Sequence, residues 1–197
     1  MAYEARNFEH LLGTAGLSDT LLKNHFTLYQ GYVANTNKLA DALAALLKDG
    51  KTATPEFAEL KRRFGWEFNG MRLHEYYFGN ITKGGKPIDK GGELFKRIAA
   101  DFGSFEAWEK DMRALATMRG IGWVILCCDC CAKRLFDVWI NEHDVGHLAG
   151  AQPLLVVDVF EHAFMIDYGL KRADYIDALW KVLDWSAVEK RLAGRCG

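Results

Sequence analysis

Asp158 and His162 stand four residues apart, directly after the apolar run 154–157. The run predicts a buried strand, which places Asp158 at its inner end. A charged Asp is almost never fully buried unless it is paired or bound to a metal. A histidine four residues on, across a strand-to-helix corner, can reach the same point in space. The two side chains therefore offer half of a four-ligand metal site, although Asp158 alone could instead cap a following helix.

Two further histidines are placed to complete such a site. The chain has six histidines, and His25 and His74 fall in two long segments that we predict to be helical. In an antiparallel pair of helices, a residue near the start of the first faces one near the end of the second. His25, His74, Asp158 and His162 would then supply three nitrogens and one oxygen. Spacing alone makes this site possible and no more, because imidazole has many other roles.

The first half of the chain reads as a helical hairpin. Ser18 and Asp19 predict a helix start, and Asp49 with Gly50 ends that helix near residue 48. Thr54 followed by proline predicts a second start, with the helix running to about residue 81. The stretch 82–92 is rich in glycine and polar residues, so we expect a boundary between domains 1–85 and 86–197.

The second half mixes short helices with strands. We expect helices at 93–101 and 104–118, strands from about 120 to 130, from 133 to 140 and from 154 to 158, and helical spacing from 161 to 192. The predicted fold class is α+β. A long antiparallel helical hairpin comes first, and a C-terminal α/β domain follows, with a small three-stranded antiparallel sheet flanked by helices.

The composition limits the partners of this protein. Of 197 residues, 50% are hydrophobic, and 25 basic residues balance 26 acidic ones, which argues against a dedicated nucleic-acid binder. No apolar run approaches the roughly 18 residues of a membrane span, and the first residues lack a secretory pattern. Four of the five cysteines crowd into 127–131, which is a poor disulfide framework. We therefore expect no nucleic acid, no membrane and a reducing cytoplasm.

The segment around Asp158 resembles a known signature. Residues 158–164 read Asp-Val-Phe-Glu-His-Ala-Phe, which resembles the Asp-x-Trp-Glu-His-Ala-Tyr signature of iron/manganese superoxide dismutases. The resemblance continues through Asp167-Tyr168 to Arg172 and Tyr175. It includes the Gly122-Trp123 strand start and the segment that ends in 32–37. In all it spans roughly residues 18 to 185.

The resemblance implies an activity and a cofactor. A superoxide dismutase converts two superoxide radicals and two protons to dioxygen and hydrogen peroxide. The implied centre is one Fe or Mn ion per subunit, with a solvent molecule as fifth ligand and with the protein ligands His25, His74, Asp158 and His162. Three imidazoles and a carboxylate suit iron or manganese, whereas zinc has no redox chemistry.

The resemblance also implies roles around the metal. Tyr32 matches a tyrosine beside the substrate channel, and Trp123 matches a tryptophan that lines the site. Glu161 matches a glutamate that crosses the interface of a homodimer to a metal-bound histidine of the other subunit. His143 stands where a glutamine often hydrogen-bonds the bound solvent, and we expect it to take that role. His147 is the alternative if the loop shifts in register.

Three departures from the family pattern concern the same region. His25 and Tyr32 are seven residues apart, whereas eight is usual in the family. Seven residues are two regular turns, so we predict that a bulge in the helix has been lost. In the family, a histidine in the substrate channel usually hydrogen-bonds a tyrosine of the other subunit, and together they form a polar gateway. Leu28 and Met165 occupy these two positions here, so both polar partners are missing together. The helical position of a second possible glutamine is Gly70.

The sequence is also compatible with other classes of protein. A ferritin-like carboxylate protein needs Glu-x-x-His repeats, and none of the six histidines has Glu three residues before it. A non-catalytic metal-binding protein on the same fold is the alternative function. The cysteines at 127–131 include two Cys-x-x-Cys spacings, but side chains alternate along a strand and need not converge. We favour small apolar fillers around a hairpin turn.

Overall fold

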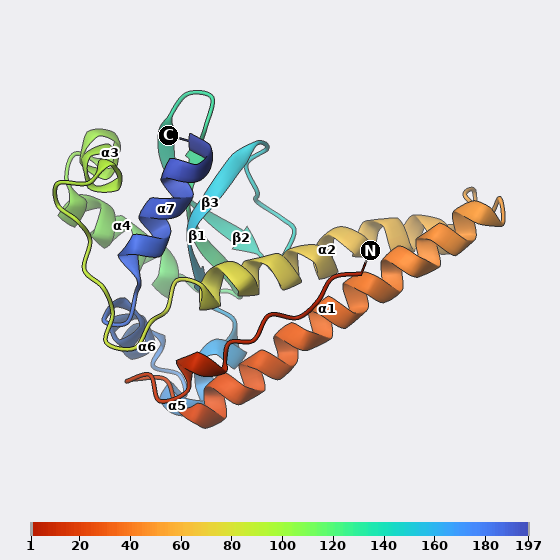
Figure 1. Ribbon diagram of the computed structural model, residues 1–197, viewed down its shortest axis with the longest axis horizontal. Helices are drawn as coiled ribbons and strands as arrows, with labels where there is room; N and C mark the ends of the chain where they lie inside the picture. Colours follow the sequence, from red (N-terminus) through yellow and green to blue (C-terminus); the bar gives the residue numbers. More distant parts are fainter. Residues whose placement is uncertain (1, 197) are drawn as a thin grey trace.

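The first two helices form the predicted hairpin. The computed structural model describes residues 2–196, and the side chains of residues 2–194. Helix α1 spans Asp19–Lys48 and α2 spans Pro55–Phe78. The hydroxyls of Ser18 and Thr54 accept the amide hydrogens of the first turns of α1 and α2, as expected of N-caps. The tip of the hairpin projects away from the rest of the chain (Figure 1).

The segment before α1 runs back along the hairpin. It contains one 3-10 turn, η1 (Glu9–Leu11), and lies beside α1 (Figure 1). Asn37 holds it by two hydrogen bonds to the backbone of Tyr3, at 2.8 and 2.9 Å. The amide of Arg6 donates to the hydroxyl of Tyr29 at 2.9 Å. These contacts fix the position of the N-terminal segment against the helices.

The C-terminal half contains an antiparallel sheet of three strands. The strands are β1 (Gly122–Asp129), β2 (Arg134–Asn141) and β3 (Ala151–Asp158), in the order β2-β1-β3. The register pairs Trp123 with Ile140 on one side and with Asp158 on the other. Gly122 has a φ of 139°, and a Cβ there would lie 2.0 Å from the carbonyl oxygen of Ile140. Glycine is thus required where β1 begins, one residue before Trp123.

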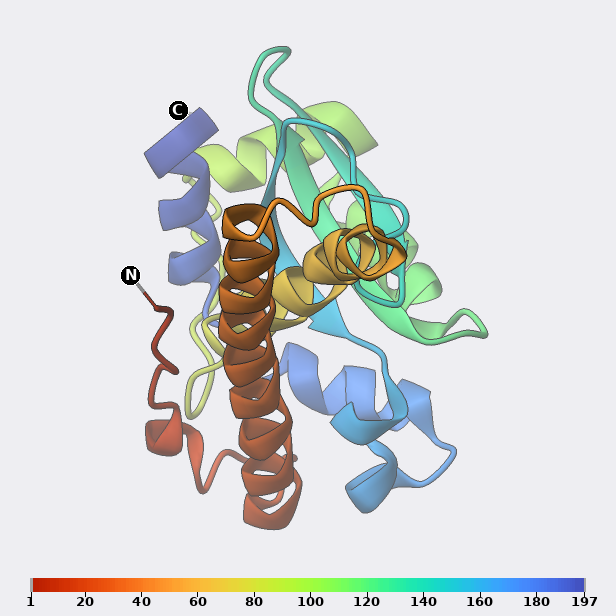
Figure 2. The ribbon, with the colours of Figure 1, turned by 90° about the vertical axis from the view of Figure 1, so that its right-hand side faces the viewer.

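Short helices surround the sheet. They are α3 (Glu93–Phe102), α4 (Phe105–Thr117), η2 (Glu161–Ala163), α5 (Met165–Tyr168), α6 (Arg172–Trp180) and α7 (Trp185–Cys196). Helix α3 contacts β2, and α4 contacts both β1 and β2. Helix α2 contacts β3, and α7 contacts β3 and β1. Figure 2, which looks at the molecule from the hairpin tip, shows the sheet behind the crossing of α1 and α2. The predicted fold class is confirmed, and one buried core joins the hairpin to the sheet.

Two predicted boundaries were wrong for tertiary reasons. Helix α2 ends at Phe78 rather than near residue 81, because Gly79 follows and Ile81 instead pairs with Leu183. Strand β3 begins at Ala151 rather than at residue 154 and contains Pro153. It is an edge strand with a register shift opposite Leu126 and Cys127, and an edge tolerates a proline. Among the described helices, none is both long and apolar enough to cross a membrane.

The cysteine cluster divides into two kinds of residue. Cys127 and Cys128 are buried and free, as expected of apolar fillers, and Cys131 is free but exposed. Cys130 is disulfide-bonded, so the prediction that it is a simple filler was wrong. The side chain of Cys196 lies outside the described residues.

Candidate metal centre

Four potential ligands converge from four different elements. His25 comes from α1, His74 from α2, Asp158 from the last position of β3 and His162 from η2. One ligand atom from each residue can be chosen so that all four lie within 4.8 Å of one another. The first three side chains are fully buried, and that of His162 is 24% exposed. The hairpin and the sheet therefore meet at this cluster.

Asp158 lies at the centre of the cluster. Its Oδ2 is 3.1 Å from Nε2 of His25, 3.2 Å from Nε2 of His162 and 3.8 Å from Nε2 of His74. Its Oδ1 accepts the amide hydrogen of Phe160 at 2.9 Å. Burial alone would raise the pKa of Asp158, but the adjacent imidazoles outweigh burial and bring it below its ordinary value. The carboxylate is thus ionised and in the form that binds a cation.

His74 is oriented as a ligand by the backbone of its own helix. Its Nδ1 lies 2.6 Å from the carbonyl oxygen of Gly70. Because a carbonyl only accepts, the hydrogen is on Nδ1, which leaves a lone pair on Nε2. That Nε2 is buried and has no hydrogen-bond partner among the described residues. Burial lowers the pKa of His74 well below its usual value, so the ring is neutral.

The donor set fits a redox-active metal ion. Burial also lowers the pKa of His25, which favours the neutral ring that binds metals. The cluster offers the neutral imidazoles of His25 and His74, the imidazole of His162 and one carboxylate, and His74 Nε2 has no other partner among the described residues. Such a nitrogen and carboxylate oxygen set is typical of mid-row metals such as iron and manganese.

The spacing of His25 and Tyr32 agrees with the shape of α1. The helix is α-helical throughout Asp19–Lys48, with no bulged turn. The rings of His25 and His74 meet edge to face, with centroids 5.0 Å apart, and Tyr32 stacks on His74 at 5.2 Å. A regular helix therefore brings both residues to the site, as the seven-residue spacing predicts.

Beside the cluster, His143 links Trp123 and Tyr32 through two hydrogen bonds. The indole Nε1 of Trp123 donates to Nδ1 of His143 at 3.0 Å, and Nε2 of His143 lies 2.8 Å from the hydroxyl of Tyr32. His143 is fully buried, and its ring stacks on Phe160. Burial lowers its pKa to about 4, so the ring is neutral near pH 7. Sequence spacing placed His143 in a loop, and the structure turns it inward.

Gly70 makes room for Tyr32. A Cβ at position 70 would lie 2.5 Å from the Tyr32 ring, closer than side-chain atoms approach. The ring occupies the space that a glutamine would fill at this helical position. The glycine at position 70 and the burial of His143 against Tyr32 are therefore parts of one arrangement.

The remaining predicted residues lie at the surface. His147 is exposed, and its Nε2 lies 3.0 Å from the carbonyl oxygen of His143, so it does not enter the site. Glu161 is exposed in this chain. Leu28 and Met165, at the gateway positions, are 41% and 39% exposed.

Three residues near the site were given no role in the sequence analysis. The hydroxyl of Tyr175 donates to the carbonyl oxygen of Asp158 at 2.9 Å and lies 3.0 Å from the hydroxyl of Tyr77. Trp66 contacts the edge of His143, with ring centroids 4.4 Å apart, and donates to Glu142. Tyr175 was part of the family resemblance, but no local pattern marks Tyr77 or Trp66, which arrive through helix packing.

The fold and the four converging ligands define a mononuclear metalloprotein with nitrogen and oxygen donors. The sequence profile described as iron/manganese superoxide dismutases, C-terminal domain, matches residues 90–191. A superoxide dismutase [Fe] of Aquifex pyrophilus is 38% identical over 181 residues, 89% of this chain and 84% of that protein. This chain belongs to the iron/manganese superoxide dismutase family.

This chain is similar both to relatives named for iron and to relatives named for manganese. A superoxide dismutase [Mn] of Haloferax volcanii is 36% identical over 162 residues, 82% of this chain and 79% of that protein. A superoxide dismutase [Fe] of Sulfolobus acidocaldarius is 34% identical over 167 residues, 83% of this chain and 79% of that protein. The likeness extends over most of each chain and includes the hairpin as well as the sheet.

Proposed function

We propose that this protein is a superoxide dismutase with one iron or manganese ion per subunit. Two superoxide radicals and two protons become dioxygen and hydrogen peroxide. The observation that carries the proposal is the convergence of four ligand atoms within 4.8 Å, in a chain whose relatives are superoxide dismutases. When bound, the ion supplies one-electron redox chemistry between its divalent and trivalent states.

We assign the binding of the ion to His25, His74, Asp158 and His162. The carboxylate contributes the negative charge that favours the higher oxidation state, and the neutral imidazoles leave reduction accessible. The Gly70 carbonyl holds the hydrogen of His74 on Nδ1 and so aims Nε2 at the cluster. The amide of Phe160 fixes one oxygen of Asp158 and leaves the other for the site.

We assign proton control to Tyr32 and His143. Burial raises the pKa of Tyr32 above its ordinary value, so its hydroxyl keeps its proton. His143 donates from Nε2 to the Tyr32 oxygen, which leaves the Tyr32 hydrogen available to another acceptor. Trp123 fixes the His143 ring from the other side. The three side chains thus form a fixed polar wall beside the ligands.

The non-catalytic alternative is not favoured, and a loading experiment tests it. The metal-free protein is loaded separately with iron and with manganese, and superoxide consumption is measured for each form. We expect activity with at least one metal and none in a His25→Ala variant whose circular dichroism is unchanged. Activity with neither metal would favour the binding-protein alternative.

We infer that the protein is a homodimer in which Glu161 reaches the other subunit. Support comes from its exposure beside His162, and from exposed apolar side chains in the same region, Leu28, Ile121, Met165 and Ile166. Sedimentation velocity tests this directly. Glu161→Ala should weaken the dimer, and a wild-type protein that sediments as a monomer at micromolar concentration would contradict the inference.

A cytoplasmic location stays a prediction from the sequence. The free thiols of Cys127, Cys128 and Cys131 favour a reducing compartment, whereas the disulfide at Cys130 weighs against it. Cell fractionation with alkylation of free thiols before lysis would test both the location and the state of Cys130.

A further inference from the structure

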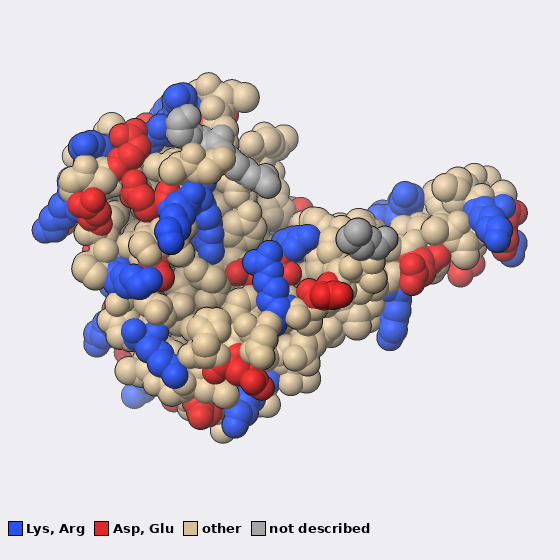
Figure 3. All heavy atoms as spheres, in the orientation of Figure 1, with Lys and Arg blue, Asp and Glu red and all other residues tan. Residues whose placement is uncertain are grey.

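A polar cavity lies on the side of α2 that carries Glu75, away from the metal ligands. Its volume is about 360 Å³, and the residues that line it are Arg6, Arg72, Glu75, Tyr76 and Arg191. They come from the N-terminal segment, from α2 and from α7. On the face drawn in Figure 3, basic side chains stand on both sides of the hollow between α7 and the hairpin.

The cavity brings together more positive charge than negative charge. Glu75 is its one acidic lining residue, and its oxygens already have partners. Arg72 lies 2.7 Å and Arg6 3.6 Å from Oε2, and the Tyr29 hydroxyl donates to Oε1 at 3.1 Å. Three guanidinium groups against one carboxylate leave a net charge of two positive units in the lining.

Arg191 is the guanidinium without an anionic contact. It donates to the side chain of Asn80 and to the carbonyl oxygens of Leu154 and Tyr76, which are all neutral. Within residues 2–194, no carboxylate lies within ion-pair distance of it. Burial lowers its pKa to about 10, so it stays charged near neutral pH. Arg191 is half-buried, and Asp184 acts on it without lying in direct contact. A half-buried cation without a contacting counter-ion is costly, and an anion in the cavity would relieve that cost.

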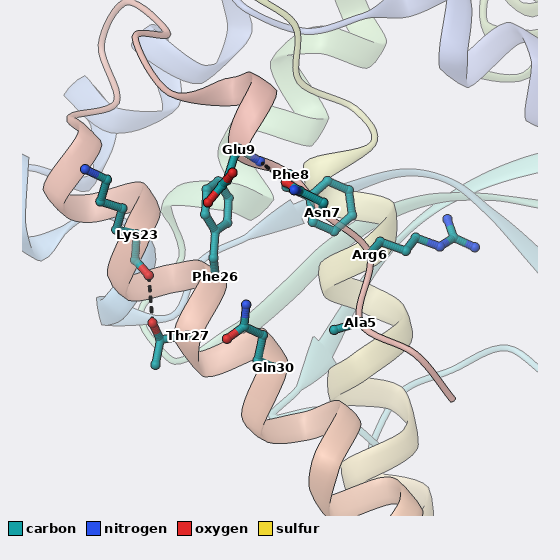
Figure 4. Close-up of a pocket in the computed structure, with 9 residues that line it drawn as sticks. All are labelled: Ala5, Arg6, Asn7, Phe8, Glu9, Lys23, Phe26, Thr27 and Gln30. Carbon is teal, nitrogen blue, oxygen red and sulfur yellow. Dashed lines mark hydrogen bonds between the residues drawn. The ribbon is translucent and has the colours of Figure 1, made fainter. Parts of the chain in front are cut away.

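The arginines that line the cavity have hydrogen-bond donors that they do not use. A guanidinium has five N–H groups. Among the described residues, Arg72 uses one of them in a hydrogen bond and Arg191 uses three. The side chain of Arg6 is 62% exposed, and within the described part of the chain its one ionic contact is the 3.6 Å approach to Glu75. Figure 4 shows Arg6 turned away from the neighbouring pocket of Lys23, Thr27 and Gln30.

The backbone contacts of Arg6 hold it at the cavity. Its amide donates to the hydroxyl of Tyr29, which in turn donates to Glu75.

The cavity is large enough for a small anion, because its volume exceeds the roughly 30 Å³ that one water molecule occupies in the liquid. Arginine forks match the oxygens of a tetrahedral anion better than any other side chain.

We propose that Arg6, Arg72 and Arg191 form a binding site for a phosphate-class oxyanion, separate from the metal centre. The ligand is either inorganic phosphate or the phosphate group of a monoester. Binding would link the N-terminal segment, α2 and α7, and would stabilise the folded chain in proportion to ligand concentration.

A calorimetric titration tests the site in the metal-loaded protein. Inorganic phosphate and adenosine monophosphate are titrated separately, with ionic strength held constant by sodium chloride. We expect binding of at least one of the two by the wild-type protein, and about tenfold weaker binding in each of Arg6→Gln and Arg72→Gln, since each removes a charge-assisted hydrogen bond. The tighter of the two ligands identifies the source of the phosphate group.

The matched control is Arg62→Gln, which removes the same charge from α2 at an exposed position paired with Glu59. It should bind phosphate as the wild type does. Arg6 is mostly exposed, so its substitution leaves folding intact, and metal content is checked in every variant. Absence of binding by the wild type, or equal binding by wild type and both cavity variants, would overturn the proposal.

Discussion

The indole Nε1 of Trp123 donates to Nδ1 of His143 at 3.0 Å, deep in the protein. An indole can only donate, so Nδ1 is unprotonated and the neutral ring carries its hydrogen on Nε2. That hydrogen is directed at the Tyr32 oxygen, 2.8 Å away. A single contact from the start of β1 thereby decides which way the hydrogen bond between His143 and Tyr32 runs.

Replacing Trp123 with phenylalanine should allow the neutral ring of His143 to carry its hydrogen on either nitrogen. The variant leaves Nδ1 buried without a donor, which costs about 1–3 kcal/mol of stability. We expect a mixture of tautomers in the ¹⁵N spectrum of the metal-free protein and about a tenfold loss of kcat in the metal-loaded enzyme. Trp66→Phe is the control, because Trp66 contacts the same ring but donates to Glu142. An unchanged ¹⁵N pattern in Trp123→Phe would refute this role.

Gly70→Ala should damage the site by displacing Tyr32. The added methyl group would lie 2.5 Å from the Tyr32 ring, so the ring must move away from His74 and His143. We expect a loss of about 1–3 kcal/mol in the free energy of unfolding, together with reduced activity. Gly65→Ala in the same helix has nothing within 4 Å of its Cβ and should gain about 0.5–1 kcal/mol from helix propensity. Urea unfolding of the two variants gives the comparison, and equal shifts would contradict it.

Substituting a metal ligand should lower the metal content of the protein, whereas substituting a histidine outside the site should not. His74→Ala removes a buried nitrogen that has no other partner, so we expect less than a tenth of the metal bound by the wild type. His147→Ala removes an exposed ring and should retain full metal content. Elemental analysis after loading with iron or manganese measures both. Full occupancy in His74→Ala would exclude this residue as a ligand.

The helices and strands were largely predictable because their signals are local. Ser18 and Thr54 do cap the two long helices, as their positions in the sequence indicate. The errors arose where distant segments decide the outcome. Ile81 leaves the helical pattern to pair with Leu183, and Pro153 is accepted because β3 lies at an edge of the sheet.

The surroundings of the metal ligands were less predictable than the ligands themselves. His143 follows Glu142, whose φ is 52°, in a loop that nothing in the local sequence marks as buried. Trp66 and Tyr77 reach the site only because α2 crosses the sheet. The disulfide of Cys130 was missed since an odd number of crowded cysteines gives no pairing signal.

Asp137, remote from the metal ligands, should make the stability of the chain depend on pH. It lies on β2, where Trp108 donates to its Oδ1 at 3.1 Å. Its Oδ2 is buried without a partner among the described residues. Burial raises the pKa of Asp137 to about 7, and the nearby Asp111 acts in the same direction. The folded state thus keeps a proton that the unfolded chain releases near pH 4.

Stability should therefore fall as pH rises from about 4 to about 7. In that window the unfolded state binds fewer protons than the folded state, so the free energy of unfolding decreases, by up to about 4 kcal/mol, and then levels off. Asp137→Asn mimics the protonated acid and should remove this decline, so its advantage over the wild type appears only above pH 5. Asp41→Asn, on an exposed position of α1, should keep the wild-type profile. Urea midpoints at pH 5, 6, 7 and 8 measure the difference, and parallel profiles for wild type and Asp137→Asn would show that Asp137 is ionised in the folded protein throughout.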